Sequence, residues 1–398
     1  MTRTTLSRVL PMAAVGLLGC SDSAGPGAPD FEDPTAYLTY DEIVDHMRSA
    51  ESRAPAIAEL VDVTAMYGTP LTHEGRAMYA LRISDNVGVD EDEPTFLMVA
   101  AHHANEIGTP VVALDAIGRF LRGYGSDQTI TSLVDEYEIW IAPLWNPDSH
   151  PDSRKNGRTP NGVNLNRNYP FLWDTACSGS TDPTHGNFKG AAPGSEPEVQ
   201  AMAALSDDQR FTKVLDYHSA GRETLFGYSC SPHELLGYLG VEAAGLSIAS
   251  GYEGRIRPPS AEGEHYQWQL GLYSNYSFLT EIGVSQSPTY EEAVAETEGL
   301  WAGTLWMLQR PVPISGHVTD AVSGDALEVS IEYLEHPFTL GERNVSEPRF
   351  GRYHAFLPTG AHTLRFSHPG YVTLDVPIMV TSAGVVRDIA LQRTPLGN

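Results

Sequence analysis

The sequence predicts an α/β domain with a mixed, mostly parallel twisted sheet and helices on both of its faces, followed by a small all-β sandwich. Three apolar, strand-like runs end at or just before His103, His218 and Glu281, and helical patterns lie between them. Beyond Pro311 no helical period remains, and short strand-like runs alternate with turn residues. In open α/β sheets, sites form where the carboxyl ends of the strands meet, so we expect these three side chains to share one edge.

The length and charge of the chain limit what it can be. Its 398 residues exceed the usual size of one hydrophobic core, so we expect a large domain and a smaller one. The formal net charge of −26 argues against a nucleic-acid partner, because phosphate binding needs a basic surface. The expected segments are a leader at 1–19, a flexible tether at 20–36, the α/β domain at 37–310 and the sandwich at 311–398.

The leader has the features of an export signal. Arg3 and Arg8 give it a basic start, and a short apolar run ends in Gly19 and Cys20. It resembles a bacterial lipoprotein signal, in which Cys20 becomes the lipidated first residue; an ordinary secretory signal with a chance cysteine is the alternative. Ser21 after the cysteine favours the outer membrane. We therefore expect an exported protein of the cell envelope, anchored only by lipid or released.

The first half of the α/β domain begins with a helix. Residues 41–60 show a helical pattern, with Thr39 or Asp41 as N-cap. Residues 77–83 alternate as a strand does, and residues 85–93 form an acidic loop.

The central stretch is the apolar run at residues 95–101. It ends in His102, His103 and Glu106, and residues 109–121 then show helical spacing. The two histidines and the glutamate therefore lie in a loop between a buried strand and a helix.

The second half of the domain alternates strands with long loops. Residues 149–195 are rich in Gly, Pro, Asn and Ser and are too long for a simple connection, which is typical of functional loops. The other expected elements are strands at 138–144, 214–218 and 278–281 and helices at 195–205 and 290–309. The tail is expected to form an antiparallel sandwich with strands at 314–318, 329–334, 353–357, 362–366, 371–376 and 385–391.

The spacing of His103 and Glu106 suits a metal site. Three residues apart in a tight loop, an imidazole and a carboxylate can turn toward one point, and zinc accepts both. A catalytic zinc needs three protein ligands and one open position, and His218 at another strand end supplies the third ligand. Glu281 adds the carboxylate that can take a proton from water. His102 is the rival ligand to His103.

Several ordered motifs resemble the M14 family of zinc metallocarboxypeptidases over residues 37–310. The motifs are His103-Ala-Asn-Glu106 with Gly108, Asn146-Pro147-Asp148, Arg154-Lys-Asn156, residues 162–170, Ser195-Glu-Pro-Glu198, His218-Ser219 and Thr280-Glu281. The resemblance implies a hydrolase with one zinc ion per chain that acts on the C-termini of peptides or proteins. It implies zinc ligation by His103, Glu106 and His218, acid/base catalysis by Glu281, carbonyl and oxyanion stabilisation by Arg154, and a grip on the terminal carboxylate by Asn166 and Arg167.

The chain departs from the family pattern at positions that matter for the site. Asn164 stands where the family commonly has an aspartate that hydrogen-bonds the first zinc histidine. An amide can accept the same hydrogen bond but raises the basicity of that histidine less than a carboxylate does. Ser149 replaces a glycine. The position of the mobile tyrosine that caps the substrate falls on Pro259, so Tyr266 or Tyr252 would have to substitute.

The specificity pocket has two candidate residues at its base. Tyr266 would disfavour a simple preference for basic residues, whereas Glu264, one register away, would favour it. The sequence leaves this choice open.

Two further features complete the expectations. Cys177 and Cys230 are candidates for a disulfide in an oxidising compartment. The tail resembles the transthyretin-like domain of the regulatory branch of the family, through Leu357-Pro-Thr-Gly360 and His368-Pro-Gly-Tyr371, and packing is its simplest role. A monomer is expected.

Three functions are compatible with these motifs. The first is a carboxypeptidase that removes C-terminal residues from peptides. The second uses the same zinc machinery on cell-wall muropeptides, as a peptidase or amidase. The third is a non-catalytic peptide-binding protein, against which the complete set of expected site residues argues.

Overall fold

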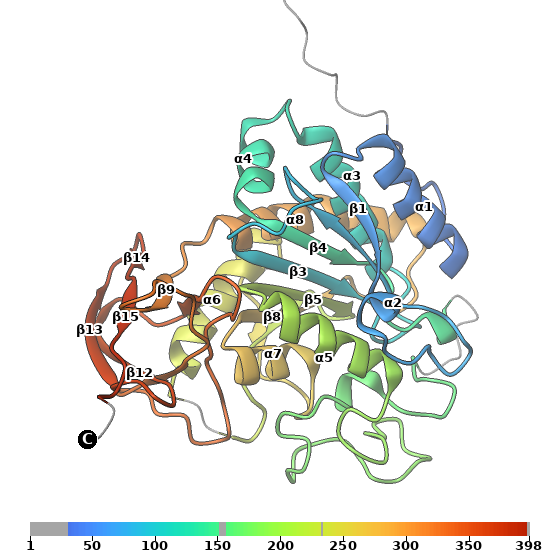
Figure 1. Cartoon of the computed structure of the whole chain (residues 1–398). Helices are drawn as coiled ribbons and strands as arrows, with labels where there is room; N and C mark the ends of the chain where they lie inside the picture. The colour runs from blue at the N-terminus through green and yellow to red at the C-terminus, as the bar shows by residue number, and fades with distance from the viewer. Residues whose placement is uncertain (1–30, 151–156, 232–233, 396–398) are drawn as a thin grey trace, which may run out of the picture.

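The computed structural model describes residues 31–150, 157–231 and 234–395. Figure 1 shows an α/β domain with a central sheet and, beside it, a β-rich domain formed by the C-terminal part of the chain. Cys20 and Arg154, to which the sequence assigns lipidation and oxyanion stabilisation, lie outside the described residues.

The central sheet has eight strands in the order β1-β2-β4-β3-β5-β8-β6-β7. Strands β4, β3, β5 and β8 pair in parallel, whereas β1 with β2, β2 with β4 and β6 with β8 are antiparallel. The sheet is therefore mixed and parallel at its centre, as predicted. The strand bounds are β1 (Ala58–Asp62), β2 (Tyr79–Ile83), β3 (Thr95–Ala100), β4 (Glu138–Ala142), β5 (Lys213–Ser219), β6 (Glu223–Leu225), β7 (Ile256–Arg257) and β8 (Tyr276–Ile282).

Helices cover both faces of this sheet, and α3 and α5 lie on opposite faces in Figure 1. Strand β3 serves both cores, because Phe96 and Met98 join one apolar cluster and Leu97 and Val99 join the other. The helices are α1 (Tyr40–Arg53), α2 (Val63–Tyr67), α3 (Thr109–Gly123), α4 (Gln128–Glu136), α5 (Pro197–Gln209), α6 (Leu236–Ala249), α7 (His265–Tyr273) and α8 (Tyr290–Gln309), with short 3-10 turns η1 (Pro147–Ser149) and η2 (Leu165–Arg167). Within the described ranges, none of these helices combines the length and apolar character needed to cross a bilayer.

The prediction that the first helix continues to residue 60 is wrong. Thr39 caps α1 in a capping box with Glu42, but the helix ends at Arg53 and β1 follows. Pro55 explains the break, because proline restricts the preceding residue to extended conformations and lacks an N–H group. Residues 58–62 then pair with β2.

The C-terminal domain consists of two small sheets around an apolar core. One sheet is β10-β12-β13, and the other is β11-β9-β14 with β15 also paired to β9. Strands β14 and β15 run parallel to β9, so the expected purely antiparallel sandwich is corrected: the chain returns after β13 and runs beside its own first strand. The strands are β9 (Ile314–Asp320), β10 (Ser330–Tyr333), β11 (Arg352–Ala355), β12 (Gly360–Ser367), β13 (Leu374–Val380), β14 (Val385–Val386) and β15 (Ile389–Leu391).

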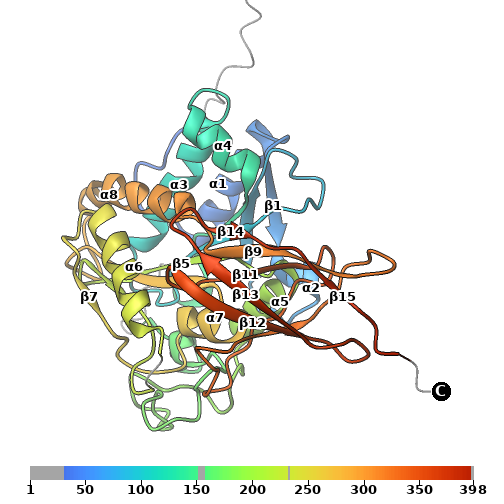
Figure 2. The same ribbon diagram turned by 90° about the vertical axis from the view of Figure 1, so that its left-hand side faces the viewer.

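Charged groups, backbone hydrogen bonds and apolar side chains all contribute to the contact between the two domains. Arg349 contacts Asp90 and lies 3.1 Å from an oxygen of Asp208, while the rings of Tyr276 and Phe356 stack with centroids 4.8 Å apart. Figure 2 shows the C-terminal strands lying across the end of the α/β domain, near α6. The acidic loop predicted at residues 85–93 thus receives arginine side chains of the second domain.

Candidate active site

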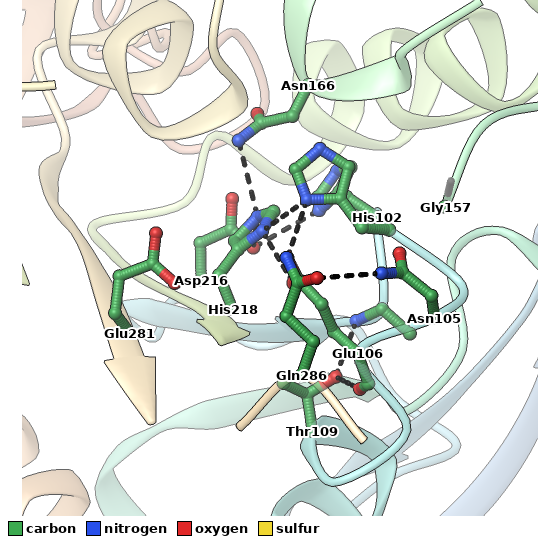
Figure 3. Close-up of polar contacts among 12 residues, drawn as sticks. His102, Asn105, Glu106, Thr109, Gly157, Asn166, Asp216, His218, Glu281 and Gln286 are labelled. Atoms are coloured by element: carbon green, nitrogen blue, oxygen red, sulfur yellow. Dashed lines mark hydrogen bonds and ion pairs between the residues drawn. The ribbon is translucent and has the colours of Figure 1, made fainter. Parts of the chain in front are cut away.

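The site lies at the carboxyl ends of β3, β5 and β8. After β3, Ala101 has a positive φ of 57°, and the chain turns through the loop that leads to α3. The hydroxyl of Thr109 holds this loop in place, because it donates to the Glu106 carbonyl (2.9 Å) and accepts from the Ala101 N–H (3.1 Å). Figure 3 shows how the loop presents its side chains toward β5.

Three of the predicted ligands lie together at this edge. His103 Nδ1 is 2.8 Å from Glu106 Oε1 and 3.2 Å from His218 Nδ1, and His218 Nδ1 is 3.0 Å from Glu106 Oε2. We call His103, Glu106 and His218 the open cluster, because the His103 side chain remains 17% exposed at a cavity.

The donor atoms of the open cluster fit one zinc ion. Nitrogen ligands at about 2.0–2.1 Å from a tetrahedral zinc lie about 3.3–3.4 Å apart. The two Nδ1 atoms are 3.2 Å apart, and the two carboxylate oxygens of Glu106 lie 2.8 Å and 3.0 Å from them. His103 turns its other ring nitrogen away, to Asn164 Oδ1 at 2.9 Å, so its Nδ1 is left for a metal ion.

The charges around the open cluster favour a cation. Burial raises the pKa of Glu106, but His103 and His218 outweigh it and lower this pKa to about 2. Burial lowers the pKa of His218, but Asp216 and Glu106 together raise it well above its ordinary value. Positive charge at this point, whether a proton or a metal ion, is therefore stabilised.

Glu281 reaches the same place from the neighbouring strand. Strands β5 and β8 pair so that His218 and Glu281 lie opposite each other, and Figure 3 shows the Glu281 side chain beside His218. Burial, reinforced by the charge of Glu106, raises the pKa of Glu281 to about 7. Its buried Oε2 makes no hydrogen bond within the described structure. A carboxyl group of this kind can both accept and return a proton near neutral pH.

Arg257 is a neighbour of Glu281 that the sequence does not reveal. Its Nη2 lies 3.4 Å from Glu281 Oε1, and its Nε donates to Glu223 Oε1 at 2.7 Å. It sits on the two-residue strand β7, which pairs with β6 at the edge of the sheet. A strand of two residues has no recognisable period, so the sequence pattern does not predict β7 or the position of Arg257.

Arg167 and Asn166 differ in where they point. Arg167 lines the cavity, and its Nη1 lies 3.0 Å from Glu264 Oε1. Asn166 is buried behind the open cluster, where its Oδ1 accepts from the backbone N–H of His265 at 2.8 Å and its Nδ2 lies 3.3 Å from His218 Nε2. In this structure only the arginine of the predicted carboxylate-binding pair reaches the cavity.

The cavity measures about 610 Å³ and has a strongly polar lining. A hydrogen bond from Asn105 Nδ2 to Gln286 Oε1 (3.2 Å) closes one part of its rim. Its lining residues are His103, Asn105, Glu106, Arg158, Asn164, Arg167, Thr184, Gly186, Asn187, Ser219, Ala220, Glu281 and Gln286.

The candidate tyrosines lie elsewhere. Tyr266 is fully buried against Leu225 and Leu279, and its hydroxyl donates to the Gly227 carbonyl at 3.2 Å. The hydroxyl of Tyr252 donates to Glu296 at 2.7 Å. Neither is among the residues that line the cavity.

A second histidine cluster lies directly behind the first. His102 Nδ1 and His265 Nδ1 are 3.1 Å and 3.0 Å from the two carboxylate oxygens of Asp216, and all three residues are fully buried. We call His102, Asp216 and His265 the closed cluster. Burial lowers the pKa of His102 to about 4, although Asp216 opposes this shift. The rival ligand His102 thus belongs to the closed cluster.

A disulfide joins Cys177 to Cys230, with Cα atoms 6.0 Å apart. The bond connects the long loop before α5 to the segment after β6. Glu262 ties the same two segments together, because its Oε1 accepts from the Cys230 N–H at 3.2 Å and its own N–H donates to the Cys177 carbonyl at 2.9 Å.

Similarity to solved structures supports the fold of the α/β domain. A carboxypeptidase A from Helicoverpa armigera superposes with a TM-score of 0.59 at 20% identity, covering 68% of this chain and 72% of that one. Bovine thrombin-activatable fibrinolysis inhibitor, solved in complex with a tick carboxypeptidase inhibitor, gives 0.58 at 20% identity, covering 68% and 96%.

Sequence comparisons give the family. Metallocarboxypeptidase A of Trichophyton rubrum is 30% identical over 223 residues, which is 51% of each chain, and carboxypeptidase A2 of Mus musculus is 26% identical over 274 residues, or 62% of each. The chain thus spans about half the length of the first of these relatives. The family model described as zinc carboxypeptidase, Peptidase_M14, matches residues 43–296. This match covers more than half of the chain, which therefore belongs to the M14 family of zinc carboxypeptidases.

Proposed function

We propose that this protein is a zinc-dependent carboxypeptidase that hydrolyses the last peptide bond of peptides or proteins. One observation carries the proposal: a single cavity is lined by His103 and Glu106 of the open cluster, by Glu281 and by Arg167, and His218 completes the open cluster from the buried side. Metal ligands, a proton-transfer group and a carboxylate-binding group are the three parts that this reaction needs.

The zinc ion would be held by His103, Glu106 and His218. When bound, it supplies Lewis-acid polarisation of the scissile carbonyl and acidifies a water molecule. Glu281 would accept a proton from a water molecule in the cavity and deliver it to the leaving amine. Because the pKa of Glu281 is about 7, its carboxyl group can act both as a proton acceptor and as a proton donor at neutral pH.

Arg167 would make the enzyme an exopeptidase. Its planar guanidinium group can bind a terminal carboxylate through two parallel hydrogen bonds, and an internal residue of a peptide offers no such group. In the described structure Glu264 lies 3.0 Å from Arg167 Nη1, which keeps the guanidinium group at the cavity wall. The role of Arg154 at the oxyanion stays a prediction from the family pattern.

The test compares a peptide with its C-terminal amide. We expect release of the terminal amino acid from the free acid, loss of release on chelation with recovery on adding Zn²⁺, and no release from the amide. Release from the amide at a similar rate would contradict the role of Arg167. Cleavage of purified muropeptides without cleavage of ordinary peptides would instead support the cell-wall alternative.

We also propose that the protein is exported and lipid-anchored through Cys20. The motif around Cys20 supports this, and a Cys177–Cys230 disulfide fits an oxidising compartment. Expression in a bacterial host with an alkyne-labelled fatty acid should label the wild-type chain and leave Cys20→Ser unlabelled. Equal labelling of both would exclude Cys20 as the lipidated residue.

A further inference from the structure

The two metal-facing histidines have different partners behind them. His103 directs its Nε2 to the neutral amide oxygen of Asn164 at 2.9 Å. His218 Nε2 lies 3.4 Å from the carboxylate oxygen Oδ1 of Asp216. A carboxylate behind a ligating histidine fixes its ring and raises its basicity more than an amide can. The site therefore has its anion behind the second histidine.

Strand geometry places Asp216 there. Residues 216 and 218 are two apart on β5, so their side chains leave the same face of the sheet. Both side chains are buried, and Figure 3 shows Asp216 behind His218. Asp216 is thus supplied by the same strand that carries the metal ligand His218.

The hydrogen bonds of the closed cluster show which protons Asp216 receives. The Tyr169 hydroxyl lies 2.8 Å from His102 Nε2, and burial keeps the pKa of this tyrosine well above its usual value. Tyr169 therefore donates to Nε2, and His102 donates from Nδ1 to Asp216 Oδ1. His102 is neutral, with its tautomer fixed by its neighbours.

His265 is fixed in the same way. Gln269 Oε1 accepts from Asn275 Nδ2 at 2.7 Å, so Gln269 Nε2 is the atom that faces His265 Nε2 at 3.1 Å. His265 Nε2 is then the acceptor, and its Nδ1 donates to Asp216 Oδ2 at 3.0 Å. Two neutral imidazoles thus bind Asp216 without neutralising it.

The amide of Asn166 limits which group can accept a proton from His218 Nε2. Asn166 Oδ1 accepts from the His265 backbone N–H, so its Nδ2 donor group faces His218 Nε2 at 3.3 Å. When a metal ion takes Nδ1 of His218, the ring proton is on Nε2. Asp216 Oδ1 is then the acceptor for that proton, because Asn166 presents a donor.

We propose that Asp216 is the positioning residue of the metal site, held by His102 and His265 so that its negative charge lies behind His218 and takes the place of the charge missing at Asn164. This rests on the zinc site of the proposed function. It also assigns the closed cluster a single task. Its imidazole nitrogens face Asp216, Tyr169 and Gln269, so it supports the neighbouring metal site and is not itself a second one.

Zinc affinity of the full chain tests the proposal, measured by competition with a chromophoric chelator. Asp216→Asn should bind zinc about 10- to 100-fold more weakly. Adding Asn164→Asp to this variant restores a carboxylate behind the other histidine and should recover much of the lost affinity. Tyr252→Phe is the matched control: it removes the hydrogen bond from a buried tyrosine to Glu296, outside both clusters, and should lower the melting temperature while leaving zinc affinity unchanged.

Two outcomes would overturn the proposal. One is Asp216→Asn with wild-type zinc affinity and only a lower melting temperature, which would make Asp216 purely structural. The other is a double variant that binds zinc as weakly as Asp216→Asn alone. Zinc that binds as expected without any peptide cleavage would contradict the proposed function and leave this inference standing.

A measurement on the wild-type enzyme covers the case in which Asp216→Asn does not fold. With ¹⁵N-labelled histidine and one equivalent of Zn²⁺, NMR should show His218 protonated at Nε2 and His102 and His265 protonated at Nδ1. A second tightly bound zinc ion that shifts His102 and His265 would overturn the assignment of the closed cluster.

Discussion

The open and the closed cluster contain the same kinds of side chain, two histidines and one carboxylate, yet their surroundings differ. In the closed cluster every imidazole nitrogen faces a hydrogen-bonding partner, and all three residues are fully buried. In the open cluster the two Nδ1 atoms face each other at 3.2 Å, and the two carboxylate oxygens of Glu106 lie 2.8 Å and 3.0 Å from them.

This difference teaches how to tell a metal site from a support network. A fully paired buried cluster gains nothing from an ion, because binding would break the hydrogen bonds that offset its burial. A cluster whose nitrogen and oxygen atoms converge on one point instead favours positive charge there, either a proton or a metal ion. The following experiments test this distinction.

The largest effect is expected at Glu281, which belongs to neither cluster. Glu281→Gln removes proton transfer and should lower kcat by about 10²- to 10⁴-fold. Zinc content and melting temperature should stay close to wild type, because the open cluster is intact. Steady-state kinetics on a peptide substrate provides the measurement, and a kcat within tenfold of wild type would refute the assigned role.

Replacing each of the two adjacent histidines by alanine distinguishes the roles of the two clusters. His103→Ala should abolish tight zinc binding while the zinc-free protein keeps its stability, because this side chain is partly exposed. His102→Ala removes the His102 partner of the Tyr169 hydroxyl and one of the buried hydrogen bonds to Asp216, and it should lower the free energy of unfolding by about 3 kcal/mol. Denaturant unfolding without zinc checks both, and the reverse order of stabilities would contradict the comparison.

Gly157 tests how closely the open cluster is fitted to its surroundings. A Cβ added at Gly157 would lie 2.1 Å from Asn105 Oδ1 and 2.8 Å from the Cβ of His103. Gly157→Ala should displace His103 and weaken zinc binding about tenfold, by the scale seen for altered ligand support. Gly162→Ala is the control, because it also has a positive φ but meets its nearest atom at 3.6 Å. Equal loss in both variants would point to backbone strain instead.

A buried carboxyl group outside both clusters is expected to affect stability and not zinc binding or catalysis. Glu198 is fully buried with no hydrogen bond to either side-chain oxygen, and burial raises its pKa to about 8. Between its ordinary pKa of 4.5 and this value, the folded chain holds a proton that the unfolded chain releases. Its contribution to the free energy of unfolding therefore falls by about 1.4 kcal/mol per pH unit over this range.

Glu198→Gln cannot titrate, so its stability relative to wild type should rise between pH 5 and pH 8. Denaturant unfolding at several pH values measures this difference. Glu291→Gln, at an exposed position on α8, should leave the wild-type slope unchanged. A pH-independent difference between Glu198→Gln and wild type would show that Glu198 ionises normally.

Much of this arrangement could be predicted from the sequence, because the strands that deliver His103, His218 and Glu281 are apolar runs that end abruptly. The choice between His102 and His103 needed the family spacing, since both follow the same strand. The position of Asp216 beside His218 could also be predicted, because residues two apart on a strand share a face. The contact of Arg257 with Glu281, and the contacts of His102 and His265 with Asp216, join segments that are distant in the sequence. No local pattern contains such contacts.

The end of α1 was predicted wrongly for a different reason. Pro55 marks the break in the sequence, but the apolar period continues across it into β1 and hides the change of structure. The parallel pairing of β14 and β15 was also not predictable locally, because strand propensity does not specify direction.

That pairing has a consequence for how the chain folds. Strand β9 opens the C-terminal domain, but its partner β15 is formed by residues 389–391, close to the end of the chain. The described strands of the central sheet are all present by residue 282 and can assemble first, whereas the small domain can close only when residues 389–391 are available to pair with β9. Before the small domain has folded, Phe356 does not stack on the ring of Tyr276. A truncated or stalled chain would therefore expose the face of the Tyr276 ring that Phe356 covers.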